Sequence, residues 1–464
     1  MKKLKHDLGL RIIKATNVIL MTLAFAGCWF GYYADRIVIP YYRMGNWGIL
    51  ALFVLIYVIF ARIYDAFLVS ENRISEMIYS QGLSVLFSDM ILFVVIWLLW
   101  RRFPNMLPGL AALAAQLLFA IVWSVAAHKW YYASFPPRKS AIVHDRPYAM
   151  EQMIQEYGLE KKFDIQLTMD AQTCVQDLSV LADMNTVFVS GVRSHERNII
   201  LKYCVANGID TYVLPRIGDI IMSGAKKMHM FHLPMLRVGR CNPHPEQAFL
   251  KRLFDIVSSA AALLVVSPIM IVTAIAIKAY DGGPVFYKQN RLTRNGKVFK
   301  VIKFRSMRVD AEKDGVARLS TGDKDDRITP VGRVIRKLRI DELPQLLNIL
   351  GGSMSVVGPR PERPEIAEKY EQELPEFRLR LQVKAGLTGY AQVYGKYNTT
   401  PYDKLQMDLM YIANPSFVED LRIVFATIKI LFIPESTDGI AEGQTTAMAE
   451  STAEKTQDKE LQNV

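Results

Sequence analysis

The sequence has too few cysteines, in the wrong spacing, for a disulfide framework or a zinc site. Its four cysteines, Cys28, Cys174, Cys204 and Cys241, form no Cys-x-x-Cys pair. A dinucleotide-binding fingerprint is also missing, because the turn after the first predicted strand of the middle region reads HDRPYAM and contains no glycine. We therefore exclude a disulfide-stabilised secreted module, and we expect the globular parts to face the cytosol.

Apolar residues, by contrast, are abundant. Of the 464 residues, 51% are hydrophobic, and the mean hydropathy is +0.13. Six Trp, 21 Tyr and 22 Phe exclude a disordered chain, and the apolar content exceeds what a soluble globule needs. At about 150 residues per domain, the length predicts two to four domains, and part of the chain must contact lipid.

Four nearly uncharged runs near the N-terminus are each long enough, at about 20 residues, to cross the hydrocarbon core of a bilayer. They extend over 15–34, 44–61, 77–100 and 103–128. Five basic residues precede the first run, whereas the loop after it has only Arg36 and Arg43, so the positive-inside rule predicts a cytoplasmic N-terminus. Asp89 interrupts the third run, and we expect it to pair within the bundle rather than to form a proton path.

The middle of the chain alternates short β-rich runs with helical ones. The predicted strands are SAIVH, FDIQLT, TVFVS and DTYVL, between Ser140 and Pro215. This order predicts a parallel sheet covered by helices. Without the glycine fingerprint we expect a structural or oligomerising role, with ligand binding as the alternative. From Pro434 onward the chain is polar, acidic and free of aromatic residues, which predicts a disordered tail.

A strongly basic segment follows, with eight basic residues and no acidic one between Lys288 and Arg308. Asn295-Gly296 between two β-rich runs predicts a hairpin. Alternation along the second strand places Lys303 and Arg305 on one side. The segment is either a solvated face or a surface for anionic lipid or a phosphate-rich substrate, and nucleic acid is a poor match because the chain is anchored in a membrane.

Two further motifs carry groups suited to chemistry. In RIDELPQLLNIL, proline favours a new helix, so Asp341 and Glu342 are expected at a helix N-terminus. There, peptide dipoles and nearby cations would keep Asp341 ionised and nucleophilic, although a simple capping role is an equal alternative. In SVVGPRPERPE, Gly358 to Pro361 form a rigid loop that presents Arg360, a residue suited to binding phosphate.

A fifth apolar run covers 256–277 and is long enough to span a bilayer. Ser267-Pro268 interrupts it, because proline removes a backbone donor and the serine hydroxyl can satisfy a freed carbonyl. We therefore expect a re-entrant helix that leaves the membrane on the side it entered, with a kinked full crossing as the alternative.

Taken in order, the motifs KRLFDIVSSAAALLVVSP, GGPVFYKQNR, KVFKVIKFRSM, RIDELPQLLNIL, VVGPRP and GLTGYAQV closely resemble those of the bacterial polyprenyl-phosphate sugar phosphotransferases. The resemblance covers about Gln247 to Pro434. Four helices and a Rossmann-like domain before this part are similar to the long form of these monotopic phosphoglycosyl transferases, which includes the undecaprenyl-phosphate galactose and glucose phosphotransferases.

The resemblance implies transfer of a sugar 1-phosphate from a UDP-sugar to undecaprenyl phosphate, with release of UMP and with Mg²⁺. Asp341 would be the nucleophile, Glu342 would help to hold the metal together with Asp341, and Arg336 would stabilise charge. Residues implied in substrate binding are Lys303, Arg305, Pro359, Arg360, Pro361, Gln289, Arg291 and Asp408. Ser267 and Pro268 would set the break of the re-entrant helix.

The expected fold class is a membrane α-helical bundle followed by α/β parts. The domains would be four transmembrane helices over 1–134, a degenerate Rossmann-like domain over 135–240, a mixed α/β catalytic domain over 247–433 with a re-entrant helix at about 251–280, and a tail over 434–464. We expect a homodimer in the bacterial inner membrane, with the catalytic domain on the cytoplasmic face. The alternatives are a nucleotide-sugar-modifying enzyme that uses the middle domain, and a membrane scaffold that binds anionic lipid.

Overall fold

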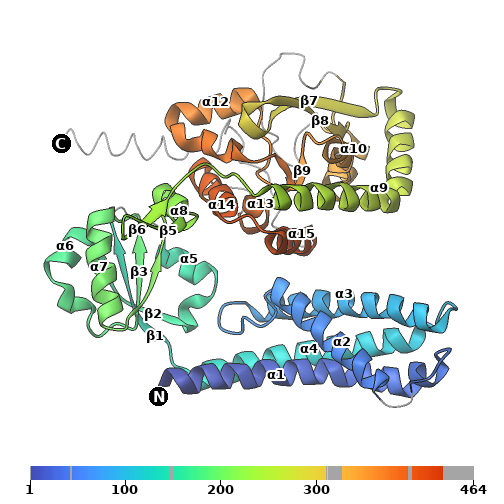
Figure 1. Cartoon of the computed structure of the whole chain (residues 1–464), viewed down its shortest axis with the longest axis horizontal. Coiled ribbons are helices and arrows are strands. Elements are labelled where there is room, and N and C mark those ends of the chain that lie inside the picture. The colour runs from blue at the N-terminus through green and yellow to red at the C-terminus, as the bar shows by residue number, and fades with distance from the viewer. Residues whose placement is uncertain are drawn as a thin grey trace. The chain divides into compact units, whose positions relative to one another are not determined.

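A computed structural model shows a chain that divides into two compact units, Met1–Pro215 and Arg216–Val464 (Figure 1). The structure describes residues 2–41, 44–145, 150–309, 311, 327–395 and 400–431. The predicted disordered tail over 434–464 lies outside the described residues.

The first unit begins with the four predicted apolar helices. They are α1 (Lys2–Cys28), which continues through a π turn (Trp29–Tyr33) and a short 3₁₀ turn (Ala34–Arg36), α2 (Gly45–Ile63), α3 (Ile74–Trp100) and α4 (Leu107–Ser134). A buried core around Trp29, Phe53 and Tyr57 joins these helices. The Gln116 amide lies 3.5 Å from Asp89, which confirms that this aspartate pairs within the bundle.

The middle region is the predicted parallel sheet, in the order β2-β1-β3-β4. Its strands are β1 (Arg138–His144), β2 (Phe163–Asp170), β3 (Thr186–Ser190) and β4 (Asp210–Val213). Helix α5 (Met150–Glu156) covers one face, and α6 (Ala171–Gln176) and α7 (Ser194–Ala206) cover the other (Figure 1). Short 3₁₀ turns at Leu159–Lys161 and Leu178–Leu181 complete the connections. The alternation of short strands and helices along the sequence therefore predicted this domain correctly.

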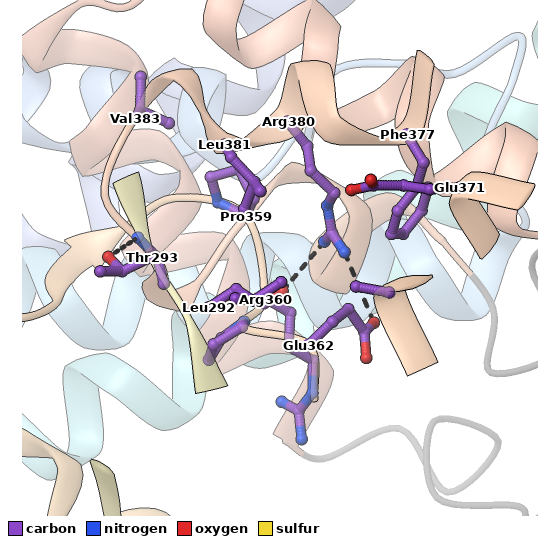
Figure 2. A pocket seen from close by; sticks show the side chains of 13 residues that line it. Leu292, Thr293, Pro359, Arg360, Glu362, Glu371, Phe377, Arg380, Leu381 and Val383 are labelled. Carbon is purple, nitrogen blue, oxygen red and sulfur yellow. Dashed lines mark hydrogen bonds and ion pairs between the residues drawn. The ribbon is translucent and has the colours of Figure 1, made fainter. Parts of the chain in front are cut away.

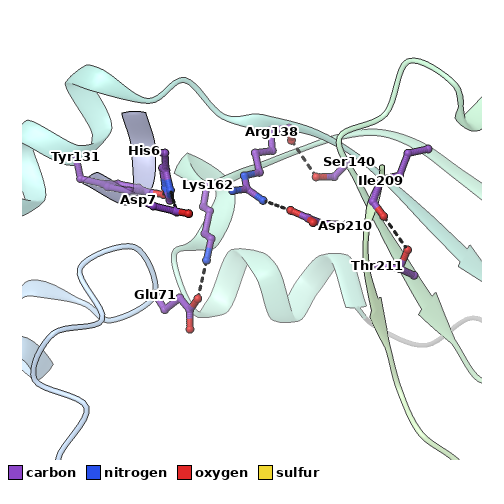
Figure 3. Close-up of polar contacts among 10 residues, drawn as sticks. All are labelled: His6, Asp7, Glu71, Tyr131, Arg138, Ser140, Lys162, Ile209, Asp210 and Thr211. Atoms are coloured by element: carbon purple, nitrogen blue, oxygen red, sulfur yellow. Dashed lines mark hydrogen bonds and ion pairs between the residues drawn. The ribbon is translucent and has the colours of Figure 1, made fainter. Parts of the chain in front are cut away.

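Ion pairs join the sheet to its surroundings within the first unit (Figure 3). Lys162, which precedes β2 and is only 8% exposed, donates to Glu71 in the loop between α2 and α3 at 2.8 Å. Arg138 at the start of β1 donates to Asp210 at the start of β4, also at 2.8 Å. The contact between Lys162 and Glu71 therefore links the sheet to the loop between α2 and α3.

The second unit begins earlier than the sequence indicates. Helix α8 (Ile217–Ser223) packs on α14 (Pro401–Ala413), and Ile220 enters the core of this unit. The hairpin of β5 (Lys226–Met230) and β6 (Leu233–Arg237) follows α8. The two compact units separate after Pro215, whereas the end of the Rossmann-like domain was predicted near residue 240. The apolar side of α8 is buried in the core of the second unit.

The long helix α9 (Pro245–Asp281) contains Pro268 and changes direction sharply part-way along its length (Figure 1). The Ser267 hydroxyl donates to the Leu264 carbonyl at 2.9 Å. This is the carbonyl that Pro268 leaves without its helical partner, so serine compensates for the missing donor as predicted. Leu264 and Val265 are 79% and 73% exposed, as expected for side chains that contact lipid.

Five helices among the described residues are long and apolar enough to cross a membrane: the four in the first unit and α9. Together they show a membrane protein. Whether α9 spans the bilayer or returns to the side it entered stays a prediction.

The remainder of the second unit surrounds one core that includes Ile349, Val357 and Leu405. The predicted hairpin is confirmed as β7 (Phe286–Leu292) and β8 (Val298–Phe304), with positive φ at Asn295 and Gly296. A second sheet pairs β9 (Ser355–Val357) with β10 (Gly386–Thr388) in parallel. The helices are α10 (Pro330–Lys337), α11 (Gln345–Leu350), α12 (Pro364–Glu373), α13 (Tyr390–Tyr394), α14 and α15 (Phe417–Leu431), with a 3₁₀ segment at Pro375–Gln382.

Candidate active site

The Asp-Glu pair lies in a 3₁₀ turn, Ile340–Glu342, between α10 and α11. The turn starts at Arg339, which adopts a left-handed conformation with φ of 54°, and Pro344 then starts the path into α11. The predicted position just before a new helix is therefore confirmed. With only six residues, α11 supplies a weaker dipole than a long helix would, so side chains dominate the electrostatics of the pair.

Strand β8 brings Lys303 to this turn. The Lys303 ammonium donates to Oε1 of Glu342 at 2.7 Å. Asn348 of α11 fixes the separation, because its amide accepts from the Ile302 N–H and donates to the Lys300 carbonyl, both at 2.9 Å. The Asn348 side chain thus bonds to two backbone groups of β8 in the way that a neighbouring strand would.

The loop Gly358–Pro361 supplies the second cation. The Arg360 guanidinium donates to the same Oε1 of Glu342 at 2.8 Å. The loop packs so closely on the next strand that a Cβ atom on Gly386 would lie 2.1 Å from the Gly358 nitrogen. The glycines in VVGPRP and GLTG are therefore required for close backbone packing, and this packing holds Arg360 beside the acidic turn.

The two carboxyl groups of the turn have opposite electrostatic surroundings. Burial opposes ionisation of Glu342, but Arg360 and Lys303 outweigh it and hold the pKa of this group well below its usual value. Burial raises the pKa of Asp341 to about 6, and the charge on Glu342 adds to the rise, whereas Lys303 and Arg336 oppose it. The expectation that dipoles and cations dominate at Asp341 is wrong, because burial outweighs the effect of the nearby cations on its pKa.

Asp341 is also distinguished by what it does not contact. Within the part of the chain that the structure describes, no hydrogen bond or ion pair engages its carboxylate, although Lys303 and Arg336 are near enough to influence its pKa. A half-buried carboxylate without a partner retains its lone pairs for another molecule. Asp341 is therefore suited to nucleophilic attack, and the capping alternative has no hydrogen bond in its support.

Two residues predicted to bind substrate lie elsewhere. Arg305 is 7% exposed and donates to Asp281 at the end of α9 (2.6 Å) and to the Pro284 carbonyl (2.7 Å). Asp408 is 1% exposed and accepts from Arg380 at 2.8 Å. Each charge already has an ion-pair partner within the second unit, Asp281 for Arg305 and Arg380 for Asp408, so substrate binding by these two residues stays a prediction.

Gln289 and Arg291 brace the loop from behind. Arg291 donates to the Pro361 carbonyl at 3.0 Å and to Oε1 of Gln289 at 2.7 Å, and burial lowers its pKa to about 10. Pro359, Arg360 and Pro361 line a pocket with Arg380 and Glu371 (Figure 2). The sequence analysis missed Arg380, because nothing in LPEFRLRLQ distinguishes it from the neighbouring Arg378.

The turn can also provide part of a metal site. Among the described residues, no group of three or more His, Cys, Asp or Glu side chains could hold an ion. Mg²⁺ is, however, commonly bound by one or two carboxylates together with substrate phosphates. The free carboxylate of Asp341 and the second oxygen of Glu342 fit this smaller donor set.

Comparison with known proteins identifies the family to which the part of the chain that contains this site belongs. The family model described as "Bacterial sugar transferase" matches residues 246–434. The exopolysaccharide production protein PSS of Rhizobium leguminosarum bv. phaseoli is 44% identical over 188 residues, which cover 93% of that protein and 39% of this chain. The chain belongs to the bacterial sugar transferase family.

Other relatives of this sugar transferase carry more specific names. The UDP-N-acetylgalactosamine-undecaprenyl-phosphate N-acetylgalactosaminephosphotransferase of Aeromonas hydrophila is 37% identical over 256 residues, 54% of this chain and 58% of that protein. The UDP-glucose:undecaprenyl-phosphate glucose-1-phosphate transferase of Caulobacter vibrioides is 37% identical over 206 residues, 43% of this chain and 76% of that protein. The match therefore spans little more than half of the Aeromonas protein.

The raised pKa of Asp341 predicts the pH dependence of sugar transfer. A nucleophilic Asp341 must be ionised, so for this role kcat/KM should fall as the pH drops through about 6, and at pH 5 it should be about tenfold below its plateau. Lys303→Met should move this limb to higher pH, because Lys303 lowers the pKa of Asp341. Recovery of full activity on return to pH 7.5 controls for acid unfolding. A limb near pH 4 would contradict the assignment.

Proposed function

We propose that the protein transfers a sugar 1-phosphate from a UDP-sugar to undecaprenyl phosphate through a covalent intermediate on Asp341. The observation that carries this proposal is the half-buried carboxylate of Asp341, which has no hydrogen-bond or ion-pair partner among the residues that the structure describes, in the same turn in which Glu342 retains Lys303 and Arg360. The relatives named as undecaprenyl-phosphate phosphotransferases support the choice of donor and acceptor.

In the first step, a carboxylate oxygen of Asp341 attacks the β-phosphorus of the UDP-sugar. The bond between this phosphorus and the oxygen that bridges to the α-phosphorus breaks, and UMP leaves with the bonding electron pair. The sugar phosphate is then bound to Asp341 as an acyl phosphate. Lys303 and Arg360 lie where they can neutralise the charge that develops on the phosphoryl oxygens, and Arg336 adds positive charge from α10.

In the second step, a phosphate oxygen of the polyprenyl carrier attacks the same phosphorus. The bond to Asp341 breaks, the carboxylate is restored, and the diphosphate-linked lipid is formed. Two displacements through one nucleophile allow a cytosolic donor and a membrane acceptor to use the same site in turn. The product would start synthesis of an exopolysaccharide, capsule or O-antigen repeat.

Glu342 and Asp341 would hold Mg²⁺ together with the diphosphate of the donor. When bound, the ion would offset the repulsion between two carboxylates and a diphosphate and would orient the phosphates. Glu342 suits this role because its low pKa keeps it ionised throughout the neutral range.

The proposed membrane topology follows from the need for a cytosolic donor and a membrane-bound acceptor to reach the same site. We infer that α9 enters and leaves by the cytoplasmic face of the bacterial inner membrane, since its bend and Ser267-Pro268 permit a return to the starting side. Basic residues flank α9 on both sides, and positive charge resists export. The site would then lie at the level of the lipid headgroups. The first unit would serve self-association as a homodimer.

Replacement of the nucleophile tests the covalent step. Asp341→Asn keeps the size of the side chain but removes its charge, so UMP release should fall by at least three orders of magnitude. With a radiolabelled sugar phosphate and no acceptor, the wild type should retain label on protein, whereas Asp341→Asn should not. Glu373→Asn, on the exposed end of α12, is the matched control and should keep both properties. Turnover close to wild type in Asp341→Asn, verified as undeamidated by mass spectrometry, would rule out this mechanism.

Removal of divalent cations tests the metal. Activity should vanish in excess EDTA and return when Mg²⁺ is added beyond the chelator. Glu342→Gln should raise the Mg²⁺ concentration needed for half-maximal activity, because one ionised oxygen ligand is lost. Full activity in EDTA would refute the metal requirement.

Single cysteines test the topology. Lys278→Cys and Asn295→Cys, each in a background without native cysteines, should be protected from an impermeant thiol reagent in intact cells and labelled in inverted vesicles. Met44→Cys, in the loop after the first helix, is the external control. Labelling of residues 278 and 295 in intact cells would show a full crossing.

A further inference from the structure

Arg380 and Asp408 form a buried ion pair that takes no direct part in the chemistry proposed above. Their side chains are 4% and 1% exposed, and they are joined by two contacts, at 2.8 Å from Nε and 2.7 Å from Nη2 of Arg380. Buried pairs of this kind often contribute little to stability, because removing both charges from water costs about as much as their attraction returns. The other contacts of Arg380 therefore indicate what the pair does besides contributing to stability.

Arg380 also reaches the loop that carries Arg360. Its Nη2 donates to the Arg360 carbonyl at 3.0 Å, and its Nη1 lies 3.6 Å from the Glu362 carboxylate (Figure 2). Asp408 accepts from Nε and contacts Nη2 of the same guanidinium, which fixes the direction of the group. Arg380 therefore bonds to the backbone of Arg360, the residue whose side chain contacts Glu342.

The four carbonyls from Pro359 to Glu362 each accept a hydrogen bond from a donor outside this segment. The Pro359 carbonyl accepts from the Gly386 N–H at 2.9 Å, the Pro361 carbonyl from Arg291 at 3.0 Å, and the Glu362 carbonyl from the Leu292 N–H at 3.0 Å. Arg380 supplies the remaining one, at Arg360. Two prolines restrict the backbone but offer no N–H of their own, so the loop cannot hold itself in place by internal hydrogen bonds.

The side chain of Arg360 is 43% exposed, and Glu342 is its one ion-pair partner among the residues that the structure describes. If the loop were unrestrained, the guanidinium of Arg360 would spend less of its time next to the reacting phosphate. Displacement by about 1 Å can cost as much as 100-fold in rate. The hydrogen bond from Arg380 to the Arg360 carbonyl restricts the motion of the backbone that carries the Arg360 side chain.

We propose that Arg380, oriented by Asp408, is a positioning residue that holds the Arg360 carbonyl and thereby aims the Arg360 guanidinium at the reacting diphosphate. This inference rests on the proposed function for the identity of the reaction, but the contact that it assigns can be measured without turnover.

The test replaces the pair by apolar residues of similar size, Arg380→Met with Asp408→Leu. Such replacements of buried ion pairs are commonly neutral or stabilising, and Lys404, Arg291 and Arg360 still offset the charge on Glu362, so the thermal midpoint should be retained. We expect kcat to fall 10- to 100-fold. In an Arg360→Ala background, the same double replacement should lower kcat less than threefold, because the side chain that it positions is already absent.

Arg305→Met is the matched control, since Arg305 is another buried and paired arginine of this unit but contacts Asp281 and Pro284 instead of the loop. Its effect should be equal with and without Arg360. If the double replacement lowers kcat by the same factor in both backgrounds, the pair has only a structural role and the proposal is overturned.

Hydrogen–deuterium exchange separates this inference from the proposed function. In the double variant, exchange of a peptide covering 357–363 should rise at least tenfold, while β7 and β8 stay unchanged; unchanged exchange in the loop would also overturn the proposal. Absence of UMP release by the wild type with every UDP-sugar tried would refute the proposed function instead, and the exchange result would still decide whether Arg380 holds the loop.

Discussion

One carboxylate oxygen holds the site together. Oε1 of Glu342 accepts from Lys303 and from Arg360, at 2.7 and 2.8 Å. The three residues come from β8, from the turn before α11 and from the loop after β9, so three separate segments meet at one atom. Loss of either cation would leave the negative charge on the largely buried Glu342 poorly compensated. Lys303, Glu342 and Arg360 therefore depend on one another. Because both cations bond to Glu342, the carboxylate of Asp341 has no hydrogen-bond partner among the described residues, as the proposed nucleophilic role requires.

Local patterns in the sequence were sufficient for several parts of the fold. Asn295-Gly296 predicted the β7–β8 hairpin, because both residues accept positive φ. The alternation of short strands with helices predicted the parallel sheet, and the proline after Glu342 predicted the start of α11. Each of these features depends on residues a few positions apart, whose preferences are visible without knowledge of the tertiary structure.

The roles of Arg305, Asp408 and Asp341 could not be read in that way. Arg305 pairs with Asp281 and Asp408 with Arg380, which are distant along the chain, and a basic segment gives no sign of which charges are already neutralised. The pKa of Asp341 depends on burial, which only the folded chain defines. The family resemblance identified the Asp-Glu pair and Arg360, but not the buried pair beneath them. The start of the second unit at α8 was missed because seven residues carry too weak a pattern to show which core they enter.

The burial of Asp341 lowers the stability of the folded protein when its carboxyl group is ionised. Its folded-state pKa lies above the ordinary value for an aspartate, so ionisation disfavours the folded protein at every pH above about 6. A neutral residue at this position would relieve that penalty. Directed evolution for heat resistance alone would therefore favour loss of this carboxylate, and a thermostable library of this protein would need a simultaneous screen for turnover to keep it.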